Sequence, residues 1–265
     1  MALVNETVRI LENEQVGPRL WLVTLEAPAM AAAIEPGQFV HMKVPRMEAH
    51  ILRRPFSVYR CNAAAGTIEI LYQVVGFGTD HMTTLEAGEE AELIGPVGNV
   101  WSAARTAQAG PILLVGGGVG AAPLFMLCEK LAQEGAAVDV ILGAQTKDAL
   151  VTRAAYEALG VNVACATDDG TFGRAGFCTS LVEEALERAC EAGAPYRSVA
   201  VCGPEPLMKI VAGMAAAADV PCEVSMEKRM ACGIGACLSC VVETVADKKR
   251  ACVDGPVFNA QDIVW

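Results

Sequence analysis

The chain has 265 residues, of which 53% are hydrophobic and 19% are charged. This length predicts two domains with room for a small additional module, and the composition predicts buried cores rather than disorder. The formal net charge of −11 would be repelled by a phosphate backbone, so nucleic acid is not expected as a partner.

The first region, residues 1–105, has the pattern of short β-strands. Apolar residues recur at every second position in QFVHMKV, where Val40 and Met42 share a face, and in TIEILYQV, where Ile68 and Ile70 share a face. Turn sequences such as EPGQ, AAGT and EAGEE fall between these runs. Short strands separated by turns at this spacing predict a small antiparallel β-barrel.

Two motifs in this region have features of a flavin dinucleotide site. In LRRPFSVYR, a guanidinium such as that of Arg54 suits a pyrophosphate, Phe56 can lie against a flat ring system, and the Ser57 hydroxyl can bond a ring nitrogen. In GFGTDHM, Thr79 lies near the start of a short helix, whose free N–H groups suit a phosphate. An edge strand carrying solvated arginines is the alternative interpretation.

The second region, residues 106–222, has a different pattern. The apolar runs PILLVGGG, AVDVILGA, VNVACATDDG and SVAVCGP alternate with helical segments such as APLFMLCEKLAQEG and TSLVEEALERACEAG. This alternation predicts a parallel sheet with helices on both faces. The uncharged stretch 106–128 is not expected to span a membrane, because three consecutive glycines and two prolines interrupt it.

A nicotinamide nucleotide site is predicted at the ends of two strands of this sheet. The segment ILLVGGGVGAAPL has the order strand, glycine turn and helix, which lets a dinucleotide approach the backbone. CGPEPLM ends the last apolar strand at its carboxyl end, where ligands of open α/β sheets bind. The residues concerned are Gly116, Gly117, Gly118, Gly120, Cys202 and Gly203. A plain tight turn and a packed cysteine are the alternatives.

The third region, residues 223–265, contains four grouped cysteines among the eleven of the chain. Cys232, Cys237, Cys240 and Cys252 have the spacing C-x4-C-x2-C-x11-C, and the first three match the plant-type [2Fe–2S] spacing. Gly233 and Gly235 permit the tight turns that a loop around a cluster needs. A zinc site with four cysteine ligands and four unrelated core thiols are the alternatives. We expect a one-electron relay.

Other features set limits on the chemistry and the location. The odd number of cysteines disfavours a disulfide framework, and the N-terminus has no signal-peptide pattern, so a cytoplasmic location is expected. There is no Ser/His/Asp or paired-carboxylate arrangement, and no catalytic residue is assigned. His41, His50 and His81 are isolated in the sequence and are expected to be structural.

The order of the three regions resembles the ferredoxin–NADP⁺ reductase superfamily. RPFS is similar to its Arg-x-aromatic-Ser flavin motif, with Phe56 where tyrosine is usual. Nearly the whole chain resembles the electron-transfer subunits of type B dihydroorotate dehydrogenase, through RRPFS, LYQVVGFGT, GGGVGAAPL, CGPEPLM, MEKRMACGIGACLSC and ACVDGPVF. The cluster motif is the most specific part of this resemblance.

The resemblance implies a β + α/β fold in three parts. These are an antiparallel FAD-binding β-barrel at 1–105, a parallel-sheet NAD-binding domain at 106–222 and a [2Fe–2S] module at 223–265. An FMN-containing catalytic subunit would oxidise dihydroorotate in pyrimidine biosynthesis, and its electrons would pass through the cluster and FAD to NAD⁺. A heterotetramer with two copies of each subunit is expected.

The resemblance also assigns site residues. The residues expected to hold FAD are Arg54, Pro55, Phe56, Ser57, Leu71, Tyr72, Gln73, Gly78 and Thr79. The four grouped cysteines would hold iron, and the glycine turn with the Cys202 region would meet NAD. The cluster loop is the expected docking surface, with apolar contacts from Met226, Met230, Ile234 and Leu238. The alternatives are a subunit of another soluble NAD(P)H-dependent complex, such as a sulfide dehydrogenase-like one, and a zinc-stabilised interaction protein.

Overall fold

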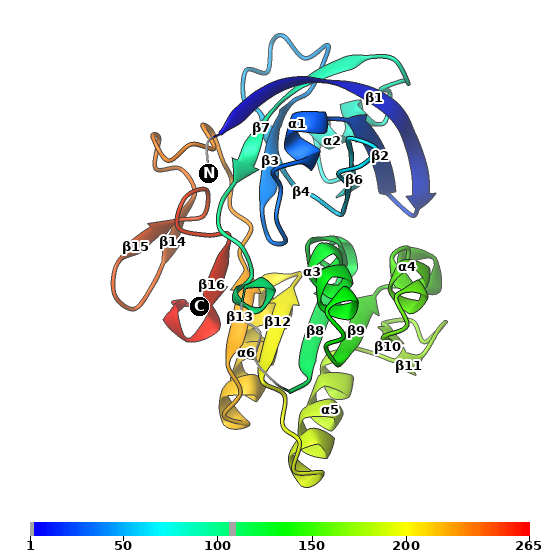
Figure 1. Ribbon diagram of the computed structural model, residues 1–265, viewed down its shortest axis with the longest axis vertical. Helices are drawn as coiled ribbons and strands as arrows, with labels where there is room; N and C mark the ends of the chain where they lie inside the picture. The colour runs from blue at the N-terminus through cyan, green and yellow to red at the C-terminus, as the bar shows by residue number, and fades with distance from the viewer. Residues whose placement is uncertain (1–2, 106–109) are drawn as a thin grey trace.

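The computed structural model describes residues 3–105 and 110–265. Two seven-stranded sheets and a two-stranded sheet make up its β-structure. Figure 1 shows the first sheet above the second, with the C-terminal segment along one flank of both. The expected class, β followed by α/β, is confirmed. The expected start of the second region at residue 106 lies outside the described residues.

The first sheet is antiparallel and has the strand order β4-β3-β7-β1-β2-β6-β5. Its strands are β1 (Val4–Gly17), β2 (Leu20–Glu26), β3 (Phe39–Lys43), β4 (Arg54–Ser57), β5 (Arg60–Asn62), β6 (Thr67–Gln73) and β7 (Glu90–Val97), with the short helices α1 (Pro28–Ala31) and α2 (Phe77–Met82). The two edge strands, β4 and β5, are separated by only Val58 and Tyr59. The sheet must therefore curl until its edges are close together, which makes the predicted barrel.

The interior of the barrel follows the predicted alternation. Val40 and Met42 of β3, and Ile68 and Ile70 of β6, are fully buried in one core. The alternate residues of β3 point to the outside of the barrel, where another part of the chain covers Phe39 and His41 but leaves Lys43 exposed.

The second sheet has the order β11-β10-β9-β8-β12-β13-β16 and is parallel except for β16. Its strands are β8 (Ile112–Gly117), β9 (Val138–Ala144), β10 (Asn162–Thr167), β11 (Arg174–Ala175), β12 (Ser198–Cys202), β13 (Cys222–Ser225) and β16 (Val257–Asn259). Its helices are α3 (Ala122–Gln133), α4 (Arg153–Ala158), α5 (Thr179–Glu191) and α6 (Glu205–Ala217). The central position of β8, with later strands on both sides of it, is a topological switch point.

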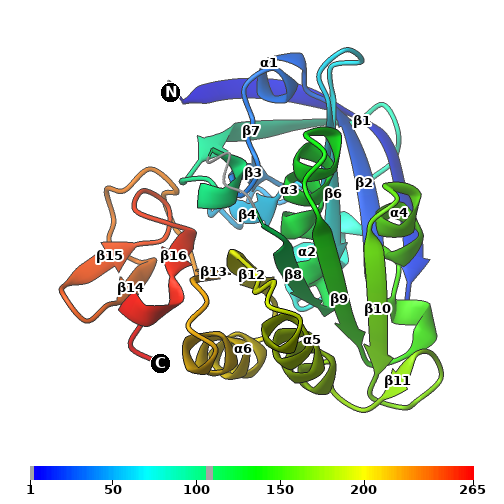
Figure 2. The same cartoon turned by 60° about the horizontal axis from the view of Figure 1, so that its bottom comes forward.

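Helices cover both faces of this sheet, as the alternation of strands and helices predicts. Ile112 and Leu114 of β8 pack with α3 in one core, whereas Leu113 and Val115 pack with α5 and α6 in another. Figure 2 shows α5 and α6 together on one side and α3 on the other. None of the helices among the described residues combines the length and the apolar character of a transmembrane helix.

The C-terminal segment leaves the second sheet after β13 and returns to it. Residues 226–256 contain the hairpin of β14 (Val241–Glu243) and β15 (Lys248–Arg250), and β16 then pairs antiparallel with β13. We call residues 226–256 the C-terminal excursion. The expected boundary between residues 222 and 223 falls within β13, so the α/β sheet takes strands from both sides of it.

Candidate functional site

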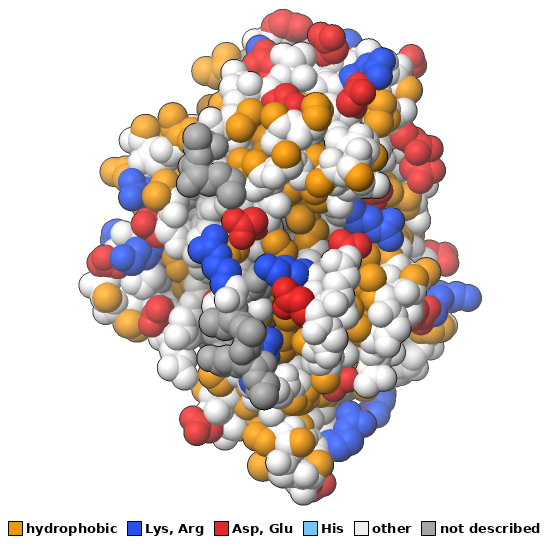
Figure 3. All heavy atoms as spheres, in the orientation of Figure 1, with side chains coloured by type: hydrophobic (Ala, Val, Ile, Leu, Met, Phe, Trp, Pro, Cys, Tyr) orange, Lys and Arg blue, Asp and Glu red, His pale blue; other side chains and the backbone are white. Residues whose placement is uncertain are grey.

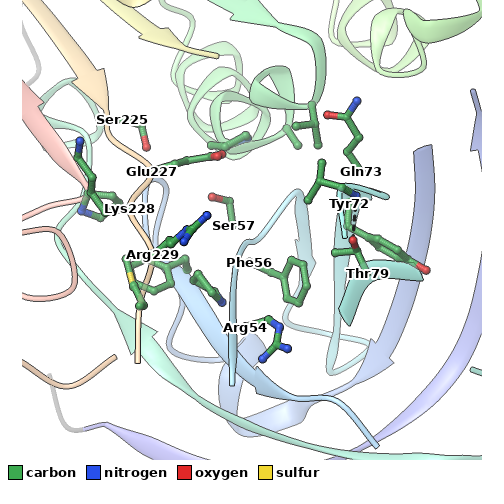
Figure 4. A pocket seen from close by; sticks show the side chains of 18 of the residues that line it. Arg54, Phe56, Ser57, Tyr72, Gln73, Thr79, Ser225, Glu227, Lys228 and Arg229 are labelled. Atoms are coloured by element: carbon green, nitrogen blue, oxygen red, sulfur yellow. Dashed lines mark hydrogen bonds between the residues drawn. The ribbon is translucent and has the colours of Figure 1, made fainter. Parts of the chain in front are cut away.

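A cleft of about 640 Å³ lies between the barrel and the second sheet. Its volume is in the range of pockets that bury small molecules and cofactors. One wall comes from β4, β6 and the turn before α2, and the other from the start of α3 and from the chain after β13 (Figure 4). The lining residues from the FAD prediction are Arg54, Pro55, Phe56, Ser57, Leu71, Tyr72, Gln73 and Thr79. The fold therefore brings together residues that lie far apart in the sequence.

Two neighbouring arginines on the barrel wall have different surroundings. Arg53 donates to the Oε2 of Glu92 at 2.7 Å and to its backbone carbonyl at 2.9 Å, so its guanidinium is already bound. Arg54 forms no ion pair among the described residues and bonds only the carbonyl oxygen of Leu52. Its charge is available to an anion in the cleft, which is what a pyrophosphate requires.

Gly78 does not line the cleft, but it makes room for Arg54. A Cβ at Gly78 would lie 2.7 Å from the Nε of Arg54, closer than side-chain packing allows. The Thr79 hydroxyl accepts from the N–H groups of Val75 at 2.9 Å and Gly76 at 3.2 Å, and donates to the Gly76 carbonyl at 3.0 Å. Thr79 therefore shapes the turn that faces Arg54, and its hydroxyl is occupied locally.

An apolar surface for a ring system lies deeper along the same wall. The rings of Phe56 and Tyr72 have centroids 6.2 Å apart with their planes tilted by 60°. Ser57 follows Phe56 and points into the cleft, as Figure 4 shows. The Tyr72 hydroxyl donates to Asn13, which fixes the ring. These groups suit a flat aromatic cofactor bearing polar ring atoms, and so fit a flavin.

The opposite wall contains residues that the sequence analysis missed. They are Val119, Ala122, Pro123, Ser225, Glu227, Lys228 and Arg229. The Glu227 side chain is exposed, but the walls of the cleft around it partly desolvate the carboxylate, which raises its pKa above the usual range. The sequence contained one indication of this wall, because MEKRM directly precedes the cysteine loop.

The predicted nicotinamide residues lie beside this cleft, at the carboxyl ends of the paired strands β8 and β12. Close packing explains why glycine is needed at two of these positions. A Cβ at Gly120 would lie 2.6 Å from the backbone of Gly203, and a Cβ at Gly117 would lie 3.0 Å from Pro204. Gly118 is different, since its φ is +56° and no atom lies within 4 Å of its Cβ position. Gly118 therefore borders open space at the switch point.

Cys202 is placed behind the wall of the cleft. It is 1% exposed, and its Sγ lies 3.9 Å from the carbonyl oxygen of Ser225, which does line the cleft. Burial raises the pKa of this thiol far above the usual range, so it is a neutral, packed group. Of the two interpretations from the sequence, packing is the one seen here.

The four grouped cysteines are arranged as two pairs. The Sγ of Cys232 accepts from the backbone N–H of Cys237 at 3.4 Å, and the Sγ atoms of Cys240 and Cys252 are 3.3 Å apart. Among residues 3–105 and 110–265, no group of three or more His, Cys, Asp or Glu side chains is arranged around one ion. Two pairs of thiols fit a cluster of two irons with two cysteines on each.

The thiol environments within the loop differ. Hydrogen bonds with Ser239, which have the largest effect, and with Cys232 lower the pKa of Cys237 to about 6. Burial raises the pKa of Cys252 to about 12 beside Cys240. The loop bends at Gly233 and Gly235, with φ of +68° and +83°, as predicted, and Arg250 donates to the Gly235 carbonyl at 3.1 Å.

The outer surface of the loop partly matches the predicted docking surface. Ile234 and Leu238 are 50% and 63% exposed. Met226 is only 4% exposed and lines the cleft instead, so its assignment to that surface was wrong. Acidic and basic side chains are interspersed on the face seen in Figure 3. Ile234 and Leu238 therefore present exposed apolar side chains on the cysteine loop.

Three protein-family models match successive parts of the chain. The oxidoreductase FAD-binding domain matches residues 7–101, and the oxidoreductase NAD-binding domain matches residues 114–213. The iron–sulfur cluster binding domain of dihydroorotate dehydrogenase B matches residues 227–264. Domains for FAD, NAD and an iron–sulfur cluster are therefore all present.

Curated proteins match over almost the full chain. The dihydroorotate dehydrogenase B (NAD(+)) electron transfer subunit of Desulforamulus reducens is 35% identical over 264 residues, which are 97% of each chain. The proteins of the same name from Geobacillus thermodenitrificans and Enterococcus faecalis are each 34% identical, over 98% of each chain.

Solved structures share the architecture. A structure of NADH-dependent reduced ferredoxin-NADP oxidoreductase has a TM-score of 0.84 and 27% identity, and the match covers 97% of this chain and 90% of that one. The ferredoxin NADP⁺ reductase of Neisseria gonorrhoeae has a TM-score of 0.68 and 16% identity, covering 80% of this chain and 91% of that one. The second likeness concerns the fold alone.

Proposed function

The chain belongs to the family of dihydroorotate dehydrogenase B electron transfer subunits, and from this we propose its place in the reaction. It receives electrons from a catalytic subunit that oxidises dihydroorotate in pyrimidine biosynthesis. The electrons pass through the [2Fe–2S] cluster and FAD and reduce NAD⁺. Bound FAD exchanges one electron with a cluster and two with a nicotinamide, which lets one chain serve both partners.

The observation that carries this proposal is the continuity between the cleft and the cysteine loop. The chain lines the cleft from Ser225 to Met230 and reaches Cys232 two residues later. A flavin in the cleft and a cluster in the loop would therefore be neighbours. This adjacency is what one-electron transfer between them needs, and it does not depend on the names of relatives.

We propose roles for the residues around the cleft. Arg54 neutralises the pyrophosphate of FAD, Phe56 supports the flavin ring and Ser57 bonds a polar ring atom. Pro55, Leu71, Tyr72, Gln73, Gly78 and Thr79 complete the site, and Cys232, Cys237, Cys240 and Cys252 hold the irons. NAD⁺ meets the flavin from the side of Gly116, Gly117, Gly118, Gly120 and Gly203, with Cys202 packed behind.

The partner, the assembly and the location are also part of the proposal. The partner is an FMN-containing catalytic subunit, in a heterotetramer with two copies of each chain. The exposed Ile234 and Leu238 at the cluster loop support docking there, close to the irons. The eleven cysteines, none of them in a disulfide, support a reducing cytoplasm. We keep 1–105, 106–222 and 223–265 as the three units in sequence, while β13, which crosses the second boundary, and β16 both belong to the second sheet.

A matched pair of cysteine variants tests the proposal in the complex with its catalytic partner. Cys237→Ser removes one ligand, whereas Cys190→Ser changes an exposed thiol on α5. We expect dihydroorotate-dependent NAD⁺ reduction to fall at least about tenfold in Cys237→Ser and to stay unchanged in Cys190→Ser. Dihydroorotate oxidation with an artificial acceptor at the partner's flavin should persist in both.

Two outcomes would contradict the proposal. One is full NAD⁺ reduction by the Cys237→Ser complex. The other is reduction driven by reduced ferredoxin and not by dihydroorotate, which would favour the kind of oxidoreductase whose structure matches at 27% identity.

A further inference from the structure

His41 lies on the outside of the barrel but is completely buried. Its neighbours on β3, Val40 and Met42, point into the barrel core, so His41 points outward. Its exposed fraction is 0%, because the C-terminal excursion covers this part of the barrel. Phe39, on the same outer face, packs in one core with Cys240 and Cys252. The side chain therefore lies at the junction of the barrel and the cysteine loop.

The imidazole contacts the loop at Gly233, the residue after Cys232. A Cβ at Gly233 would lie 2.5 Å from the Nδ1 of His41 and 2.9 Å from its Cγ. Within the sheet, His41 of β3 pairs with Pro55 of β4, between Arg54 and Phe56 of the flavin motif. His41 is thus a neighbour of both the cysteine loop and the strand proposed to hold the flavin.

The ring nitrogens of His41 are unsatisfied. Neither has a hydrogen-bond partner in the described part of the chain, although both are buried. The nearby backbone of Cys232 and of Arg53 interacts with the ring, but at distances or angles outside hydrogen-bond geometry. A neutral imidazole has one N–H donor, and a donor buried without an acceptor is unfavourable. An acceptor beside Cys232 would satisfy it.

We propose that His41 is a positioning residue of the iron–sulfur cluster, donating its N–H to a sulfur atom of the cluster at Cys232 while its ring packs against the loop at Gly233. This inference rests on the proposed role of Cys232 as an iron ligand. The sulfurs of a cluster accept N–H bonds, and such bonds stabilise its reduced, more negative form. Arg53 does not supply this donor, because Glu92 holds its guanidinium.

Histidine labelling tests the contact without changing the protein. The chain has only three histidines. His50 stacks on Phe77 at 4.6 Å, and His81 lies 3.0 Å from the Pro45 carbonyl, so both are engaged elsewhere. Full-length protein grown with ¹⁵N-histidine and reduced anaerobically should show a ¹⁵N coupling to the cluster in pulsed EPR spectra. The coupling should persist in His50→Gln/His81→Gln and disappear in His41→Phe.

The outcomes separate this inference from the proposed function. A reduced cluster at full EPR intensity with no ¹⁵N coupling would overturn the role of His41 and leave the relay intact. Protein with no cluster signal at all would overturn both. Because the first arm uses the natural sequence, it decides the question even if a variant fails to assemble its cluster.

The reduction potential provides a second readout that a purely structural role would not change. His41→Phe keeps a ring in place but has no donor, so the midpoint potential of the cluster should fall, while that of FAD stays the same. His41→Gln restores an N–H and should recover part of the shift. If the cluster potential of His41→Phe equalled that of the natural protein, His41 would be a packing residue and the inference would be wrong.

Discussion

Adjacent residues with the same chemistry have different roles in this chain, and Arg53 and Arg54 are the clearest case. Both precede Pro55 in one motif, and the sequence cannot tell which of them is available to a ligand. Glu92 lies on β7, which β3 separates from β4 in the sheet, and it holds Arg53 in a half-buried ion pair. Both arginines line the cleft, but the guanidinium of Arg54, packed over Gly78, is the one that no carboxylate among the described residues holds.

Arg54→Ala should weaken FAD binding selectively. A hydrogen bond from a charged donor contributes about 1.5–3 kcal/mol, so the Kd for FAD should rise roughly 10- to 100-fold. Flavin fluorescence titration of the deflavinated chain measures this. Arg53→Ala is the matched control, and its effect should appear in the free energy of unfolding more than in the Kd. Equal FAD affinity for Arg54→Ala and the natural protein would show that Arg54 does not hold the pyrophosphate.

Glu227 should make the stability of the chain depend on pH. Its pKa is raised by desolvation, so the unfolded state releases its proton at lower pH than the folded state does. This contribution is therefore fully present below the ordinary pKa of 4.5 and is lost as the pH rises through the raised value. In urea unfolding experiments, the free energy of unfolding of Glu227→Gln should therefore fall less than that of the natural protein as the pH is raised through this range. If the free energies of unfolding of the two proteins changed with pH in parallel, the raised pKa of Glu227 would be refuted.

At the scale of single elements, sequence patterns predicted the positions of strands and of the cysteine loop better than they predicted how separate segments of the chain pack together. The alternation that placed Val40 and Met42 in the barrel and the spacing of Cys232 and Cys237 are local properties, readable from a few residues. The burial of Met226 is not local, because it depends on where the chain after β13 crosses the barrel. The covering of His41 has the same cause, since its covering segment comes about 190 residues later in the sequence.

Gly233→Ala should disrupt the cluster loop for two reasons that can be separated. A φ of +68° costs a residue with a Cβ about 1–2 kcal/mol, and the added atom would also meet the His41 ring. Iron and acid-labile sulfide per chain should fall. His41→Ala in the same chain should restore part of the loss, because it removes the contact but not the backbone strain.

Gly213→Ala on α6 is the control for that variant, since nothing lies within 4 Å of its Cβ position and its φ is not positive. Its cluster content should equal that of the natural protein. A Gly233→Ala chain with full iron content would show that the loop tolerates a side chain there.

At the scale of the whole molecule, the C-terminal excursion ties the two sheets together. Asn99, between the barrel and the second sheet, donates to the carbonyls of Asp254 at 3.1 Å and Val257 at 2.8 Å, and accepts from the Val257 N–H at 3.0 Å. The return of β16 to the sheet was not predictable from its sequence, because VFN is too short to show a period.

Asn99→Ala should therefore lower the local stability of the C-terminal excursion where it returns to the second sheet. Loss of bonds to partly buried backbone groups costs about 1–3 kcal/mol, and hydrogen exchange should accelerate around residues 254–257. Asn62→Ala removes only a local bond to the N–H of Ala65 and should have little effect. If exchange in this segment were the same in both variants, Asn99 would not be the tie between the sheets.

The most direct test of the central claim follows electrons through the assembled complex. Dihydroorotate added anaerobically without NAD⁺ should produce the EPR signal of a reduced [2Fe–2S] cluster, and later addition of NAD⁺ should remove that signal as NADH forms. The account predicts both changes in the natural complex and neither in Cys237→Ser. Formation of NADH while the cluster stays oxidised and unresponsive to dihydroorotate would contradict it.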